Sequence, residues 1–146
     1  MPDSEIALKV PAVSQDFGFR LHHVQLAMPA GGEEDARRFY HGLLGLTEVE
    51  KPPVLRARGG AWFRGRSLEV HLGVEQEFRA ARKAHPGILT GNLEELAASL
   101  TNGGVEVLWD GDFPGFRRFY AHDPFGNRLE FLQPDAPDQP GGRTGR

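Results

Sequence analysis

Two polar side chains near the start of the chain interrupt an apolar pattern. In a strand over residues 21–27, alternation places His23 and Gln25 on one face and Val24 and Leu26 on the other. The apolar face would pack into a core, so the other face would present an imidazole and an amide. The chain contains no cysteine, which excludes a thiolate nucleophile and means that His, Asp or Glu would hold any metal.

A histidine and a glutamate stand in comparable places in the second half of the chain. His85 stands at the start of the strand-like run that corresponds to the strand with His23 in the first half. Glu130 alternates with Leu129 and Phe131 on the last predicted strand, so it points away from the aromatic face. A lone histidine on a strand is usually a structural residue. The pattern alone therefore does not decide whether these histidines are structural or bind a ligand.

The segments that would position these residues follow one plan twice. Each half contains a strand, then an amphipathic helix, then further strand-like runs. The first half has them at 19–29, 31–46 and 52–75, and the second at 85–91, 92–104, 105–110, 116–123 and 128–134. Two βαβββ units are therefore predicted, which places the chain in the α+β class and favours packing about a shared concave surface.

Composition indicates the extent of the domain and limits the kinds of partner. One domain is predicted over residues 18–134, with modules at about 18–75 and 84–134, an N-terminal extension at 1–17 and a disordered tail at 135–146. The formal net charge of −3 argues against nucleic acid as a partner. There is no apolar run of membrane-spanning length and no secretory signal pattern, so a cytoplasmic protein is expected.

Three motifs occur in an order that is typical of one superfamily. They are the opening strand LHHVQLAMP, the helix ARRFYHGLLGL with its F-Y-x-x-x-L-G-L pattern, and the closing hairpin FYAHDPFGNRLEF with a D-P-x-G-N turn. Together they resemble the vicinal oxygen chelate superfamily, which includes glyoxalase I, fosfomycin-resistance enzymes, extradiol dioxygenases and bleomycin-resistance proteins. The resemblance covers about residues 19–134 and implies paired βαβββ modules that form a cup-shaped mixed sheet.

The resemblance also implies a metal site. A divalent ion in this superfamily is typically held by the first strand of each module and the last strand of the second, which implies His23, His85 and Glu130 here, with Glu130 as the catalytic candidate. Two imidazoles and one carboxylate suit Fe, Mn, Ni, Co or Zn and leave positions open for adjacent substrate oxygens. A fourth ligand by position would be His71 or Glu69, and spacing does not choose between them.

Substrate contacts are expected on the same concave surface. Tyr120 matches a substrate-contacting tyrosine of fosfomycin-type enzymes, and alternation places Arg118 on the same face, where it could bind an anion. His71 is a further candidate for substrate contact. Trp62 or Phe63 could supply an apolar wall.

Three functions remain open at this level. The leading one is a metal-dependent, homodimeric enzyme that acts on a small molecule with vicinal oxygen donors, by lyase or isomerase, epoxide-opening or dioxygenase chemistry. The rival is a binding protein of the bleomycin-resistance type that holds a ligand without turnover. The third is a structural dimer whose histidines are core residues.

Overall fold

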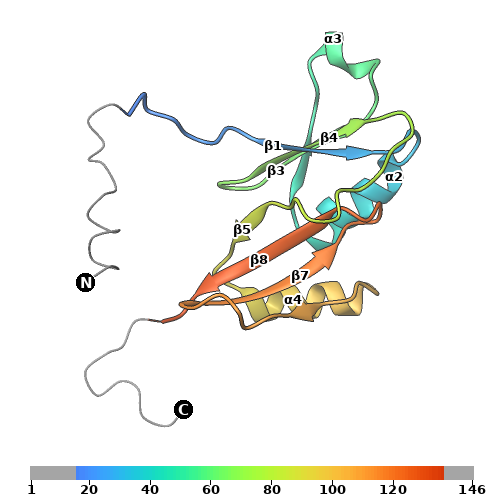
Figure 1. The fold of residues 1–146 in the computed structure, drawn as a ribbon. Coiled ribbons are helices and arrows are strands. Elements are labelled where there is room, and N and C mark those ends of the chain that lie inside the picture. Colours follow the sequence, from blue (N-terminus) through green and yellow to red (C-terminus); the bar gives the residue numbers. More distant parts are fainter. Residues whose placement is uncertain (1–15, 137–146) are drawn as a thin grey trace, which may run out of the picture.

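The computed structural model describes residues 16–136, so most of the extension at 1–17 and of the tail at 135–146 lies outside the described residues. Figure 1 shows two groups of strands with helices beside them. The first module contains β1 (Val24–Met28), α2 (Glu33–Ala36), η2 (Arg37–Leu43), β2 (Thr47–Val49), α3 (Pro53–Arg56), β3 (Ala61–Arg64) and β4 (Glu69–Val74). The second contains β5 (Gly87–Leu89), α4 (Leu93–Asn102), β6 (Leu108–Trp109), β7 (Phe116–His122) and β8 (Arg128–Pro134).

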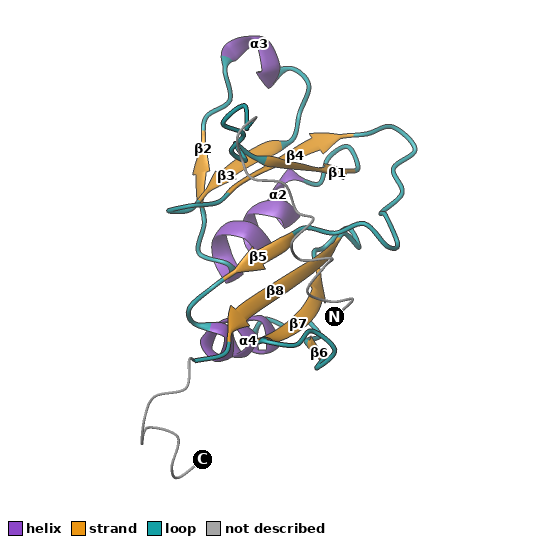
Figure 2. Ribbon diagram, turned by 60° about the vertical axis from the view of Figure 1, so that its left-hand side comes forward, coloured by secondary structure: helices purple, strands orange, loops and turns teal. Residues whose placement is uncertain are grey.

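The predicted repeat is confirmed by the strand order. The first module forms sheet A, ordered β1-β4-β3-β2, and the second forms sheet B, ordered β5-β8-β7-β6. In each sheet the first strand runs parallel to the last, and the other pairs are antiparallel. The fold is therefore α+β, with two mixed sheets that remain separate in one chain (Figure 2).

The first helix departs from regular α geometry. Residues 33–36 are α-helical, and 37–43 continue as a π-helical segment in which Phe39 and Tyr40 are both buried. Three acidic residues occupy the first turn, where the helix dipole favours negative charge. The helix ends before Gly45, whose φ of 76° lies in the left-handed region typical of a helix stop.

Helix α4 begins where the sequence predicts, and a side chain from β8 caps it. Asn92 occupies the N-cap position and its side chain makes no capping hydrogen bond. Instead the Oε1 of Gln133 on β8 accepts from the Leu93 backbone N–H at 3.0 Å. The cap therefore also ties α4 to sheet B, which a local sequence pattern does not reveal.

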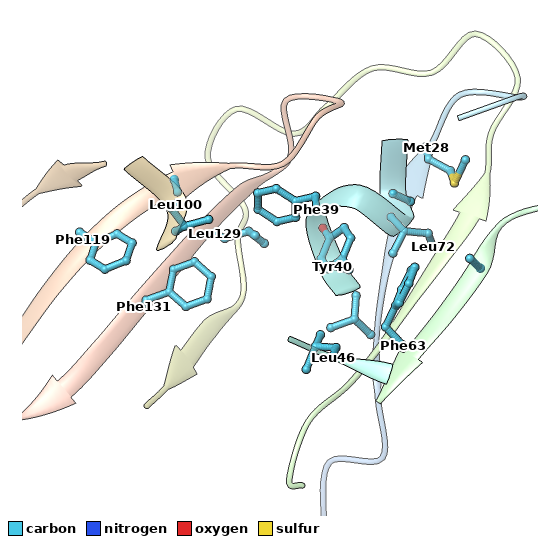
Figure 3. Packing of buried hydrophobic residues seen from close by; sticks show 14 of the residues in the cluster. Met28, Phe39, Tyr40, Leu46, Phe63, Leu72, Leu100, Phe119, Leu129 and Phe131 are labelled. Atoms are coloured by element: carbon cyan, nitrogen blue, oxygen red, sulfur yellow. The ribbon is translucent and has the colours of Figure 1, made fainter. Parts of the chain in front are cut away.

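One hydrophobic core joins the two modules. Phe39 lies between the two sheets in Figure 3, close to Leu129, while Tyr40 faces sheet A and stacks on Phe63 with ring centroids 5.4 Å apart. Each sheet thus covers the helices with one face. We call the opposite face of each sheet, turned away from the helices, its outer face. None of the helices within residues 16–136 is long and apolar enough to cross a lipid bilayer.

The D-P-x-G-N turn holds the modules together through a buried carboxylate. Asp123 accepts hydrogen bonds from the backbone N–H groups of Phe125 and Asn127 and from the Asn127 side chain, at 2.8–2.9 Å. It also accepts one from the Tyr40 hydroxyl at 2.8 Å, across the module boundary. The Asn127 amide donates to the Ala27 carbonyl at 2.8 Å, which adds a second link to the first module.

We expect Tyr40→Phe to lower the free energy of unfolding by about 1–3 kcal/mol, because it removes one donor from a buried carboxylate. Tyr120→Phe is the matched control, since the Tyr120 hydroxyl makes no hydrogen bond within residues 16–136 and the change should cost less than about 0.5 kcal/mol. Urea titration of both variants measures this. Equal losses would show that the Tyr40–Asp123 bond does not stabilise the module contact.

Candidate functional site

Three flat rings stack on the outer face of sheet A. His71 on β4 lies opposite Trp62 on β3 and Gln25 on β1 in the strand register. The His71 ring is parallel to the Trp62 ring, with centroids 3.8 Å apart, and stacks on the His23 ring at 4.0 Å. His23 therefore reaches the face that the sequence predicts, although β1 itself begins one residue later, at Val24.

A carboxylate fixes the orientation of His71. Glu69 Oε2 lies 2.8 Å from His71 Nε2, and Glu69 Oε1 accepts from Arg64 Nε at 2.8 Å. The hydrogen bonds from Arg64 and His71 lower the pKa of Glu69 to about 2. Burial lowers the pKa of His71, and the bond to Glu69 opposes this only in part. A neutral His71 that donates through Nε2 keeps the Nδ1 lone pair for a ligand.

Sheet B carries the same kind of chain on its outer face. His85 Nε2 lies 2.9 Å from Glu130 Oε1, and Glu130 Oε2 accepts from Arg118 Nη1 at 2.8 Å. The other ring nitrogen of His85, Nδ1, lies 2.8 Å from the Lys83 carbonyl oxygen. Arg–Glu–His chains therefore occur in both modules, although the residues come from different strand positions.

Arg118 donates hydrogen bonds to two carboxylates, those of Glu130 and Asp110. Its Nη2 donates to Asp110 Oδ1 at 3.2 Å, and its guanidinium lies over the rings of Phe113 and Tyr120. The hydrogen bond to Glu130 is the main reason that the pKa of Arg118 is raised. The Asp112 backbone N–H and then Arg118 lower the pKa of Asp110. Arg118 Nε is buried and makes no hydrogen bond among the described residues.

Tyr120 lies directly beside the sheet B pair. It is opposite Glu130 in the β7–β8 register, and its ring meets the His85 ring edge-on with centroids 5.4 Å apart. The Arg128 guanidinium lies 4.1 Å above the Tyr120 ring centroid. No role is predicted for Arg128 from the sequence, although its period-2 spacing from Glu130 places both residues on one face.

The predicted metal ligands fall into two groups in one chain. The structure brings His85 and Glu130 together, whereas His23 lies with His71 and Glu69 on the other sheet. Across residues 16–136, no three His, Asp or Glu side chains converge as a metal-binding group. Each outer face therefore holds only part of the predicted ligand set, with His23 on sheet A and His85 and Glu130 on sheet B.

We expect the stabilisation that Glu69 gives to depend on pH. A carboxyl whose pKa falls from 4.5 to about 2 on folding stabilises the fold above pH 4.5, and this is lost as the pH falls toward 2. The difference in free energy of unfolding between wild type and Glu69→Gln should therefore shrink over that interval. Urea titrations at a series of pH values test this, with Glu106→Gln as the exposed control. A constant difference would show that ionisation of Glu69 is not coupled to folding.

Solved structures identify the relatives of this chain. A glyoxalase family protein from Bacillus anthracis is similar at 42% identity and TM-score 0.79, over 82% of this chain and 98% of that chain. A glyoxalase/dioxygenase from Nostoc punctiforme shares the fold at 19% identity and TM-score 0.65, over 87% and 99% of the two chains. A fosfomycin resistance protein from Listeria monocytogenes shares the fold at 13% identity and TM-score 0.60, over 83% of this chain and 95% of that chain.

Neither a family model nor a curated protein matches the chain. The two more distant structures support the fold alone. The Bacillus anthracis protein shares both high identity and nearly its full length with this chain. The chain therefore belongs to the glyoxalase family, within the vicinal oxygen chelate superfamily.

Proposed function

We propose that this protein is a metal-dependent, homodimeric enzyme that acts on a small molecule with two adjacent oxygen atoms. In this proposal each metal site combines His23 and His71 of one chain with His85 and Glu130 of the partner subunit. The observation that carries it is the division of suitable donors into two groups, on the outer faces of two separate sheets.

The donors suit a first-row divalent ion. Three imidazoles and one carboxylate, with no thiolate, fit Fe, Mn, Co, Ni or Zn. The Lys83 carbonyl lies against Nδ1 of His85, which is the kind of contact that orients a ligating imidazole, and it leaves Nε2 directed toward Glu130, the second donor of the proposed site. A bound ion would supply Lewis-acid stabilisation of negative charge on a substrate oxygen.

The chain's own residues would orient the substrate and place charge around it. Glu130 is the catalytic candidate, because Arg118 and His85 hold its two oxygens and it is almost fully buried. Tyr120 is opposite Glu130 and offers a hydroxyl for a substrate oxygen. The Trp62 ring gives an apolar wall beside His71.

Exposed apolar residues favour a second copy as the partner that completes the site. Phe17, Phe19 and Leu21 alternate along the segment before β1 and are 86%, 83% and 81% exposed. This segment runs away from both sheets in Figure 1. Leu89 on β5, the edge strand of sheet B, is 67% exposed. Apolar side chains along unpaired strand edges are typical of surfaces that pair with another chain.

A mixing experiment tests whether two chains share the metal site. We expect the wild type to bind about one Mn²⁺ or Zn²⁺ per chain, and His23→Ala and Glu130→Ala each to lose binding. If the two variants are unfolded together and refolded, half of the dimers are mixed, and each mixed dimer has one intact site. Metal content should then recover to about a quarter of an ion per chain, measured by calorimetry and elemental analysis.

The control is His122→Ala, which removes an exposed histidine outside the donor groups and should leave metal binding unchanged. No recovery on mixing would place all the ligands in one chain and contradict the shared site. No metal binding by the wild type would favour a ligand-binding protein of the bleomycin-resistance kind. Activity is then sought with glutathione hemithioacetals, fosfomycin and catechols, one for each open reaction class.

A further inference from the structure

A small cavity adjoins the ring stack of sheet A. Its volume is about 240 Å³, and it lies where the loop from residue 50 to 60 meets the outer face. That loop carries α3 and projects beyond the sheet in Figure 2. Its lining includes Gln25, Lys51, Leu55, Arg58, Gly59 and Trp62.

The loop that forms the cavity is fixed in place. Gly60 has a φ of 84°, and a Cβ there would lie only 2.0 Å from the Leu72 carbonyl oxygen, so no larger residue fits. The Gly60 backbone N–H donates to Glu33 Oε2 at 2.8 Å, and the Lys51 ammonium donates to the Gly59 carbonyl. The cavity is therefore preformed, as small-molecule sites usually are.

The charges in the cavity favour an anion. Among the described residues, Lys51 and Arg58 are the only charged side chains that line it, and both are cationic. Over the described part of the chain, no carboxylate lies within ion-pair distance of Arg58, in contrast to Arg56, which pairs with Glu50 at 3.2 Å. A guanidinium without a partner matches a carboxylate or phosphonate through two parallel hydrogen bonds.

The cavity lies next to the donors of sheet A. Gln25 and Trp62, which line it, are the cross-strand neighbours of His71 on either side. Neighbouring strands are about 5 Å apart, so a molecule anchored in the cavity can reach the His71–His23 pair with its next few atoms. The Trp62 ring and Leu55 offer apolar surface along this path.

We propose that this cavity binds the oxyanion head group of the substrate, with Arg58 as the specificity-determining residue. The substrate class is then a small organic acid, a carboxylate or a phosphonate, whose vicinal oxygens extend toward His71 and His23. This inference rests on the proposed function for the role of the ligand as substrate. Binding of the anion itself depends on Arg58 and not on a metal.

Fluorescence of Trp62 reports on the cavity. The Trp109→Phe background leaves Trp62 as the only tryptophan of the full-length chain. Metal-free protein in EDTA is titrated with benzoate, phenylphosphonate and benzamide, which is a neutral analogue of benzoate. We expect saturable changes with the anions and at least tenfold weaker binding of benzamide. Arg58→Gln should weaken binding of the preferred anion at least tenfold, and Arg66→Gln, which changes an exposed arginine outside the cavity, should alter that affinity less than twofold.

The titrations with the three compounds and the variants distinguish the possible outcomes. Tighter binding of benzoate identifies a carboxylate substrate, and tighter binding of phenylphosphonate identifies a phosphonate. Equal binding of benzoate and benzamide, no saturable response to either anion, or no effect of Arg58→Gln would overturn the inference. Anion binding that appears only with metal present would also overturn it, while supporting a metal site. Arg58-dependent binding in a protein that takes up no metal would support the cavity and contradict the proposed function.

Discussion

The buried carboxylate of Asp123 determines how the two modules face each other. It sits in the turn between β7 and β8 and accepts hydrogen bonds from that turn and from Tyr40 of the first helix. Asn127 of the same turn reaches the Ala27 carbonyl on β1. Tyr40 also belongs to the hydrophobic core that buries the helix-facing sides of both sheets, so both outer faces remain turned away from that core. Burial beside Asp123 raises the pKa of Tyr40 well above its usual value, which keeps its hydroxyl a donor.

The outer faces share a chemical plan in spite of their different sequences. On sheet A, Arg64, Glu69 and His71 form a chain of contacts, and on sheet B, Arg118, Glu130 and His85 do so. In each chain an arginine holds the carboxylate, and the carboxylate orients an imidazole. Within residues 16–136, neither face brings three His, Asp or Glu side chains together as a metal-binding group, which is why the proposed site needs two chains.

The repeated architecture and the faces of the main residues could be predicted from the sequence. Period-2 alternation places His23 with Gln25 and Arg118 with Tyr120, because residues two apart on one strand share a sheet face whatever the packing. The spacing could not choose between Glu69 and His71 as a fourth ligand, because residues two apart on one strand share a face. In the structure the two side chains contact each other on that face.

Other features depend on contacts between distant residues. The sequence predicts Arg118 as a residue that could bind an anion. In the structure its guanidinium contacts the carboxylates of Glu130 and Asp110. Asp110 comes close to Arg118 only because β6 pairs with β7. The grouping of His23 with His71 depends on β1 lying beside β4, which local patterns do not specify. The cavity at Arg58 depends on the docking of Gly60 against Leu72, which is a tertiary contact.

Anomalous diffraction from crystals of the zinc-loaded protein shows directly whether two chains share one metal site. A shared site gives one peak per chain, about 2.0–2.2 Å from nitrogen or oxygen atoms of His23 and His71 in one copy and of His85 and Glu130 of the partner subunit. A peak whose protein ligands all come from a single chain would contradict it.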